Sequence, residues 1–379
     1  MEHNLATFEA NVVALGGQVH WCATAADARQ TILDILKKRG ARRLAKGKSM
    51  VSEEIELNPF LAANGLDVIE TDLGEYILQL RDEPPSHIVM PAIHLTKREV
   101  GETFRAAHTH LDPARPLAEP REMTDEARAV LRQRFLGAEA GLTGANFLIA
   151  ETGSALIVTN EGNGDLSQTL PPVHIVLTGI EKVVPTLADA MTLVRVLARS
   201  ATGQDITAYT TLATGPKRAG DADGPEEFHV VLLDNGRTGL LDSEFRPVLR
   251  CIRCGACQSV CPVYGAIGGH AYGAVYGGPI GAVLMPALSG NPDMRHLPEA
   301  SSFCGACEAV CPVRIPLPDL MRRWRERNYA DAPSAKPMKL ALLVWGFFVR
   351  RPALYRIAIA IAARALRLYG FGWPAPERR

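Results

Sequence analysis

The sequence predicts an α/β protein: an N-terminal domain with a mostly parallel sheet, then a mainly helical domain built around cysteines, then a basic helical C-terminal extension. Up to residue 235, β-rich runs alternate with amphipathic helical segments. Seven of the eight cysteines fall within residues 251–311. The last 59 residues carry thirteen Lys and Arg against three Asp and Glu. We therefore expect domains at 1–235, 236–320 and 321–379.

The first domain owes its predicted layers to strands and helices that alternate along the chain. "TAADARQTILDILKKRG" has a Thr24/Asp27 capping pattern and an apolar face, and residues 124–136 and 186–201 also have helical periodicity. The runs expected to form strands are "QVHWCA", "LDVIETD", "SHIVMPAIH", "NFLIAETGSALIVTN", "VHIVLTG" and "FHVVLLD". This order predicts an open sheet with helices on both faces.

Charge and hydropathy exclude several classes of protein. With 41 basic and 41 acidic residues the chain has no net charge to attract nucleic acid. The first seventeen residues include acidic side chains and have no apolar stretch typical of a signal peptide. No run is long enough for a spanning helix, and the closely spaced cysteines favour metal binding over secreted disulfides. We expect a cytoplasmic protein.

Cys251, Cys254, Cys257 and Cys261 form a C-x2-C-x2-C-x3-C run that is followed by proline. This spacing is typical of ferredoxin-type iron–sulfur ligation, in which the fourth cysteine binds the other cluster. A second run supplies Cys304, Cys307 and Cys311, and Ser301 stands where its leading cysteine would be. If the crossing rule holds, Cys251, Cys254, Cys257 and Cys311 complete one site, and Cys261, Cys304 and Cys307 form a second site that lacks one ligand.

The missing ligand leaves several alternatives open. The second site could hold a [3Fe–4S] cluster, or a [4Fe–4S] cluster whose fourth iron takes Ser301, His270, His296, water or a partner's side chain. A zinc ribbon would leave three cysteines unused, and disulfides do not suit a reducing compartment. Cys22 lies in an expected strand, where a lone cysteine is usually a small buried hydrophobe.

At these cysteines the chain closely resembles the lactate utilization protein B (LutB) family. The resemblance covers both cysteine runs and the glycine-rich segment between them, and it extends upstream through "GKSMVSEEIELN", "ETGSALIVTNEGNGDL" and "LPPVHIVLTGIEKVVP". It implies an N-terminal LUD domain with a CoA-transferase-like fold, fused to a two-cluster ferredoxin-like module. Family members usually carry a longer helical segment before "FEANVVALGG" than this chain does.

The same resemblance implies two [4Fe–4S] clusters, held by the two cysteine sets given above, and a task in oxidising L-lactate to pyruvate with companion subunits. We expect an electron-transfer subunit whose catalytic centre lies in a partner, since no residue pair here has the pattern of a nucleophile with its base. The sequence leaves the electron acceptor open. The alternatives are a hydroxy-acid oxidoreductase that uses an open iron with Lys48 or Glu151, and a redox-sensing binding protein.

Other motifs give weaker signals. Gly47-Lys48-Ser49 lacks the glycine that a phosphate loop requires, so only a small-anion site at Lys48 and Ser49 remains plausible beside a solvated lysine. Glu151, Thr152 and Ser154 suit a ligand-binding loop or a hairpin turn equally. His108 and His110 have no third ligand nearby in the sequence, and we expect no metal there.

Two remaining segments have more than one interpretation. The glycine-rich loop with Tyr264, His270, Tyr272 and Tyr276 is expected to cover the clusters and donate amides to them. In the C-terminal extension, Arg356, Arg364 and Arg367 form one helical stripe, away from Leu354, Ile357, Ile361 and Leu368. This stripe predicts docking on a partner or on the protein's own acidic body, with peripheral contact at the inner face of a membrane as the second choice.

Overall fold

The computed structural model describes residues 1–288, 292–331 and 336–368. Residues 1–324 form one compact unit, and the described chain from Arg325 onward belongs to a second. The predicted boundaries at residues 235 and 320 stay predictions.

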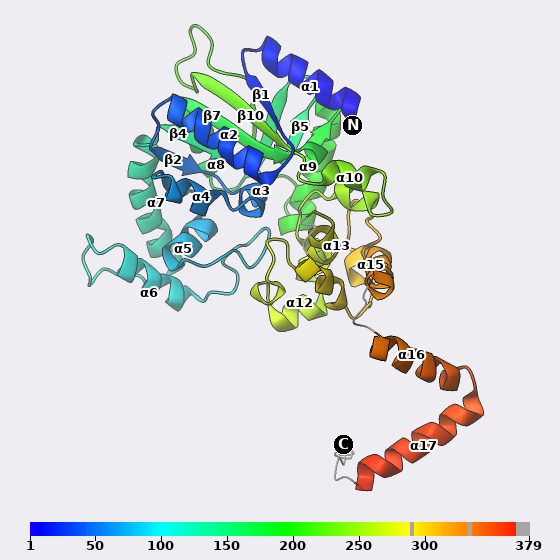
Figure 1. The fold of residues 1–379 in the computed structure, drawn as a ribbon. Helices are drawn as coiled ribbons and strands as arrows, with labels where there is room; N and C mark the ends of the chain where they lie inside the picture. Colours follow the sequence, from blue (N-terminus) through cyan, green and yellow to red (C-terminus); the bar gives the residue numbers. More distant parts are fainter. Residues whose placement is uncertain (289–291, 332–335, 369–379) are drawn as a thin grey trace. The chain divides into compact units, whose positions relative to one another are not determined.

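The first unit contains a six-stranded sheet in which every neighbouring pair is parallel, as the alternation of strands and helices predicts (Figure 1). Its strands, in spatial order, are β1 (Gln18–Cys22), β10 (Glu227–Leu233), β7 (Val173–Gly179), β4 (Ala140–Thr143), β2 (Arg43–Lys46) and β3 (Asp67–Glu70). The α/β fold with a mostly parallel sheet is therefore confirmed.

Helices cover both faces of this sheet. In β10, Val231 and Leu233 face the core under α2, whereas Phe228, Val230 and Leu232 face the core under α1. A strand that is buried on both faces reads as a continuous apolar run, as "FHVVLLD" does. The expected Thr24/Asp27 capping box starts α2. The helices of this part of the chain, on either side of the sheet, are α1 (Glu2–Ala14), α2 (Ala25–Lys38), α3 (Met50–Glu54), α4 (Leu57–Ala63), α5 (Leu73–Arg81), α6 (Lys97–Ala107), α7 (Pro120–Leu136) and α8 (Asn163–Thr169).

A second, four-stranded sheet extends the domain toward the cysteines. Its strands, in spatial order, are β8 (Val183–Val184), β5 (Phe147–Ile149), β6 (Ser154–Thr159) and β9 (Tyr209–Ala213). β5 and β6 form an antiparallel hairpin, so the first three residues of "ETGSA" are its turn and the last two begin β6. Helix α9 (Leu187–Thr202) packs on this sheet, and Ile252 of the first cysteine run joins their core.

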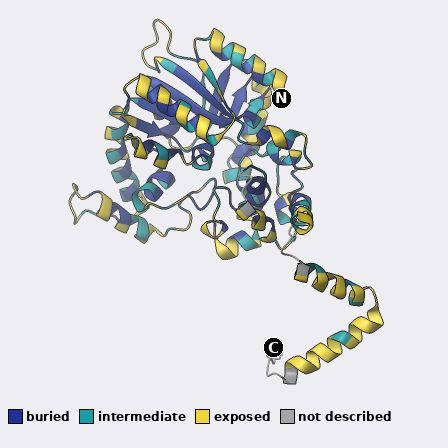
Figure 2. Cartoon of the chain, in the orientation of Figure 1, coloured by how far each residue is buried: buried dark blue, intermediate teal, exposed yellow. Residues whose placement is uncertain are grey.

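The cysteine-bearing part is mainly helical and is organised around α13 (Gly278–Leu288), whose side chains are almost all buried (Figure 2). Tyr276, Phe245 and Trp324 belong to the same core, and Phe245 stacks on Trp324 with ring centroids 4.4 Å apart. The other elements here are α10 (Arg237–Leu241), η2 (Arg246–Arg250), α11 (Ala256–Ser259), α12 (Pro262–Ile267), η3 (His270–Tyr272), η4 (Pro292–Glu299), α14 (Ala306–Ala309) and α15 (Leu317–Asp331).

The strand predicted at "SHIVMPAIH" is wrong, because residues 86–94 form a loop. This loop bonds to the cysteine module instead of to a sheet. The Tyr264 hydroxyl donates to the Ser86 carbonyl oxygen at 2.6 Å, and the Ile88 amide donates to the Gln258 side chain at 3.4 Å. Ile88 is buried in the core of that module. The apolar side chains of the 86–94 loop therefore pack against the cysteine module instead of forming a strand.

The second unit contains α16 (Lys336–Val349) and α17 (Pro352–Leu368), which contact each other. The helical extension is therefore confirmed. The side chains of Arg367 and Leu368 lie outside the described ones, whereas Trp345, Leu343 and Ile361 are exposed by 59%, 69% and 62%. Within the part of the chain that the structure describes, none of the helices has the combination of length and apolar character that crossing a bilayer requires.

Candidate metal centre

The two cysteine runs adopt the same local backbone. Arg253 and Phe303, each just before a Cys-Gly pair, have φ values of 61° and 55°. Gly255 and Gly305, just after the same cysteines, have φ values of 75° and 82° and begin the short helices α11 and α14. Left-handed conformations are costly for non-glycine residues, so their recurrence at matched positions indicates a constrained site. The chain thus builds one loop twice.

Ser301 reproduces the place of the first cysteine in this repeat. The Arg253 amide donates to the Cys251 sulfur at 3.4 Å, and the Phe303 amide donates to the Ser301 hydroxyl oxygen at 3.2 Å. The serine oxygen therefore occupies the position that the repeat assigns to a ligand atom. Of the non-cysteine candidates, His270 bonds through its Nε2 to the Pro84 carbonyl oxygen at 2.8 Å, and His296 bonds to the Asp293 carbonyl oxygen.

The structure brings Cys251, Cys254 and Cys311 together although sixty residues separate the first from the last. Burial raises the pKa of the Cys254 thiol, and the nearby sulfurs of Cys251 and Cys311 raise it further against an opposing bond from the Ala256 amide. Burial also raises the pKa of Cys257, whose sulfur neighbours include Cys251 and Cys254. These four cysteines, here called the first group, are the ones predicted to supply all four ligands of one cluster site.

Cys261, Cys304 and Cys307 form the second group. Burial raises the pKa of Cys307 to about 11, and the sulfurs of Cys261 and Cys304 contribute to this rise against a bond from the Glu308 amide. The three cysteines line one pocket together with Ser301, whereas neither His270 nor His296 lines it. The predicted three-cysteine set is therefore collected around a hollow that also contains the serine.

The donor set suits a cluster better than a single ion. Four thiolates around a tetrahedral zinc ion, with Zn–S bonds of about 2.3 Å, lie roughly 3.8 Å apart. Across the described residues, three or more candidate ligand atoms come within 4.8 Å of one another only at Glu53, Glu70 and Glu75. Amides also point at the sulfurs, as those of Tyr264 to Cys261 (3.5 Å) and Ile315 to Cys311 (3.3 Å) do. No three cysteine sulfurs of the described residues therefore lie within 4.8 Å of one another, a wider spacing than thiolates around one zinc ion have. This spacing and the amide bonds to sulfur fit an iron–sulfur cluster.

A buried charge network adjoins the first group. Arg237, which is 1% exposed, bonds Glu54 through two nitrogens and Glu181 through Nε at 2.7 Å. Arg253 lies 3.5 Å from the other oxygen of Glu181, and its guanidinium carbon lies 4.5 Å from the centroid of the Tyr276 ring. Both arginines and Tyr276 belong to the cysteine module, whereas both glutamates belong to the α/β domain.

Lys182 is the third buried cation of this region. Its ammonium donates to the Cys251 carbonyl oxygen at 3.2 Å. Burial, together with the positive charge of Arg253 and against the opposing effect of Glu181, lowers the pKa of Lys182 to about 8. Sequence reasoning missed Lys182, Arg253 and Glu181 because nothing in their spacing shows that residues 181–182 pack beside a cysteine run seventy residues later.

The weaker sequence candidates have structural explanations. Lys48 and Ser49 line a cavity, and Ser49 caps α3. Glu151 accepts a bond from the Leu187 amide at the start of α9. His108 is buried between the Tyr76 hydroxyl (2.7 Å) and Glu126 (2.6 Å), an arrangement that holds the α5–α7 core.

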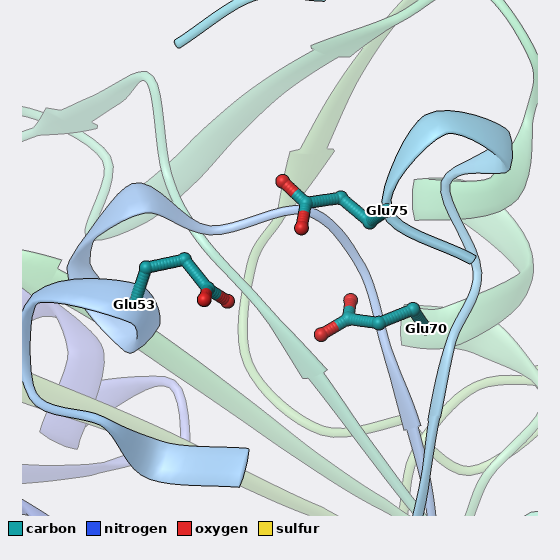
Figure 3. A group of neighbouring side chains, drawn as sticks. All are labelled: Glu53, Glu70 and Glu75. Carbon is teal, nitrogen blue, oxygen red and sulfur yellow. The ribbon is translucent and has the colours of Figure 1, made fainter. Parts of the chain in front are cut away.

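Sequence reasoning also missed a buried acidic cluster beside Lys46. Figure 3 shows the carboxylates of Glu53, Glu70 and Glu75 converging from α3, the end of β3 and α5. The Lys46 ammonium already supplies a cation, at 2.5 Å from Glu70 and 3.2 Å from Glu53. Burial and the neighbouring Glu70 together raise the pKa of Glu75 to about 8. The cluster thus contains its own counter-ion and a carboxyl that keeps its proton near neutral pH.

Replacing Glu75 with Gln should therefore flatten the pH dependence of stability. The folded pKa of about 8 exceeds the ordinary value of 4.5, so the folded state binds the extra proton between these values. Wild type should lose up to about 1.4 kcal/mol per pH unit relative to Glu75→Gln as pH rises toward 8. Anaerobic thermal unfolding midpoints between pH 5.5 and 8.5 measure this. Glu102→Gln on the surface is the control, and parallel profiles for wild type and Glu75→Gln would contradict the assignment.

Family models match both halves of the unit. Residues 5–233 match the LUD domain, and residues 247–315 match the 4Fe-4S dicluster domain. The second match supports iron–sulfur clusters at the cysteines described above. A solved structure, a DUF162 family protein from Deinococcus radiodurans, aligns with 61% of this chain and 97% of its own at 17% identity and a TM-score of 0.35, which carries no conclusion.

Relatives called lactate utilization protein B match nearly the whole chain. Those of Bacillus licheniformis and Geobacillus thermodenitrificans are 47% and 48% identical over 97% and 96% of this chain and 76% of their own length. The Bacillus subtilis protein is 46% identical over 94% of this chain and 74% of its own length. Identity at this level across both domains shows that the chain belongs to the lactate utilization protein B family.

Proposed function

We propose that this protein is the iron–sulfur electron-transfer subunit of a complex that oxidises L-lactate to pyruvate. One observation carries the proposal: Cys311 of the second run lies near Cys254 of the first, and Cys261 of the first run lies near Cys307 of the second. The names of the relatives support the task in lactate utilization, and the dicluster match supports the cofactor. The first group would hold one [4Fe–4S] cluster, and the second group would hold another with Ser301 as the candidate fourth ligand.

The bound clusters would supply one-electron transfer, whereas lactate gives up two electrons and two protons. Two centres in one module can therefore take both electrons in turn. This chain's residues would hold the clusters, exclude water from the first group and set its charge through Lys182 and Arg253. Companion subunits would contain the centre that takes the protons and breaks the carbon–hydrogen bond.

Anaerobically purified protein should contain about eight irons and eight sulfides per chain, with two reducible signals in electron paramagnetic resonance (EPR). Cys254→Ala should lose the signal of the first cluster, because Cys254 belongs only to that group. Cys22→Ala, which alters a core cysteine outside both groups, is the matched control.

Function is then tested by adding L-lactate with and without the companion subunits. Reduction of both clusters only when the companions are present supports the electron-transfer task. Reduction in the isolated chain would favour an oxidoreductase in its own right, and a single cluster signal would contradict the two-cluster assignment.

Ser301→Ala should release one iron from the second cluster, because the repeat places the serine oxygen where Cys251 places its sulfur. We expect iron content to fall by about one per chain and a [3Fe–4S] signal to appear in the oxidised protein. Ser301→Cys should restore the full iron content with a shifted potential. Ser259→Ala is the control, and an unchanged spectrum in Ser301→Ala would remove the serine from the ligand set.

The basic extension is proposed to dock on a companion subunit, since it combines thirteen basic residues with exposed apolar side chains such as Trp345 and Ile361. Deleting residues 336–379 should leave both cluster signals intact and abolish co-purification with the companions. Retained co-purification, or binding of the full chain to anionic vesicles that the deletion removes, would contradict this and favour peripheral membrane contact.

A further inference from the structure

A cavity of about 380 Å³ lies between the α/β domain and the first cysteine run. Gly47–Ser49, Gly144–Asn146 and Thr178 line it, at the carboxyl ends of β2, β4 and β7. In open α/β sheets, ligands bind at this edge of the strands. The opposite wall includes Arg253, which lies in the sequence between Cys251 and Cys254, and Tyr276. A molecule in this cavity would therefore lie beside the first cysteine group.

Three cations line the cavity: Lys48, Lys182 and Arg253. The Lys48 and Lys182 ammonium groups each bond a backbone carbonyl oxygen, of Val89 at 2.5 Å and of Cys251 at 3.2 Å. Neither has a carboxylate within 4.0 Å among the residues that the structure describes. Each ammonium has three donors, so spare hydrogen-bonding capacity remains on both.

Two buried polar atoms of the lining also have no partner in the described chain. The Arg253 Nη1 is buried without an acceptor, and the Thr159 hydroxyl is buried without any hydrogen bond. Leaving such atoms unsatisfied costs about 1–3 kcal/mol each, and more for a charged group. An anionic ligand oxygen would satisfy the Arg253 Nη1, and the Thr159 hydroxyl offers a separate hydrogen bond elsewhere in the cavity.

The lining contains two carboxylates as well, Asp72 and Glu161. Asp72 caps α5 by accepting bonds from the Gly74 and Glu75 amides. Lys48 is the cation that interacts electrostatically with both carboxylates. The two carboxylates exceed the single positive charge of Lys48, so this end of the cavity disfavours an anion, and Lys182 and Arg253 form the seat for one.

The end of the cavity beside Cys251 has an excess of positive charge. Arg237, Arg253 and Lys182 carry three positive charges, and Glu54 and Glu181 carry two negative ones. One buried positive charge is left over beside Cys251. The remaining lining is largely apolar, with Ile157, Leu177, Leu197 and Ile252 among its side chains. Binding sites for organic molecules combine an apolar lining of this volume with a few placed polar groups.

We propose that this cavity binds a small 2-hydroxy or 2-oxo monocarboxylate, with the carboxylate between Lys182 and Arg253. The choice of acid class rests on the proposed function, whereas the anion site rests on the cavity, its cations and its unsatisfied atoms. Because Arg253 belongs to the first cysteine run and Lys182 bonds its Cys251 carbonyl oxygen, binding of the anion changes the charge beside the first cluster. The cavity thus couples ligand occupancy to the redox state of that cluster.

The coupling has a definite sign. A positive charge near a cluster favours its reduced, more negative form, and a bound anion cancels that charge. Ligand binding should therefore lower the midpoint potential of the first cluster. By linkage, the oxidised protein should bind the anion more tightly than the reduced protein does.

The test uses the full-length, cluster-loaded protein without companion subunits. Calorimetric titration with L-lactate, pyruvate, acetate and inorganic phosphate should show binding of the first two in preference to the others. Lys182→Met should weaken this binding about tenfold or more, because it removes one charge-assisted bond. Lys182→Arg should retain most of the affinity, and Lys37→Met on the surface of α2 is the matched control.

An EPR-monitored redox titration with and without pyruvate measures the coupling. A lowered potential for the first cluster, with the second unchanged, supports the proposal. Equal binding of all four anions would reduce the cavity to a general anion site and overturn the acid class. If Lys182→Met loses its clusters, Lys48→Met is the second variant: Lys48 bonds Val89 and not a cysteine run, and its loss leaves Asp72 and Glu161 without their cation, so the cavity should repel the anion and bind it more weakly.

Absence of binding to a protein that contains both clusters would overturn the cavity proposal. The electron-transfer function would stand in that case if companions still deliver electrons from lactate.

Discussion

The packing of α11 against α14 is the contact on which the proposed chemistry depends. Each short helix follows a left-handed glycine and carries the third cysteine position of its run, so the contact places Cys257 and Cys307 near each other. Once these helices are paired, the final cysteine of each run reaches the opposite sulfur group: Cys311 lies near Cys254, and Cys261 lies near Cys307. Neither group is complete within one run, so the site forms only when residues some fifty positions apart have already folded together.

The α/β domain is part of this construction. Met50, Ile88 and Val89 pack into the core of the cysteine module, and Ile252 packs into the core under α9. The loop at residues 86–94 runs along the module and bonds to Tyr264 and Gln258. A cysteine loop held this way has few alternative conformations, which suits electron transfer because little rearrangement then accompanies a change in charge.

Sequence reasoning predicted what depends on local pattern. The α2 and α9 caps and the apolar strands β7 and β10 follow from short-range spacing, and the structure contains all of them. The two cysteine sets stay a prediction, which the proximity of Cys254 to Cys311 supports. β2 and β4 were missed because "RLAK" and "AGLT" are short and carry little β-branched character. The loop at 86–94 was misassigned because tertiary burial produces the same apolar run as a strand does. The cavity and the Glu75 cluster join residues from several strand ends, and no spacing rule in one sequence reports such long-range convergence.

Charge balance explains why the two domains share one core. Arg237 and Arg253 come from the cysteine module, and Glu54 and Glu181, whose two negative charges match their two positive ones, come from the α/β domain. Lys182 then adds a positive charge from the α/β side at the backbone of Cys251. Burying an unbalanced cation is costly, so this arrangement is stable only beside a negative group. A thiolate-bound cluster carries negative charge, and a carboxylate in the cavity adds more. Under the proposed function, the α/β domain would therefore tune the electrostatics of the first cysteine group, and the two domains would act together as one redox unit.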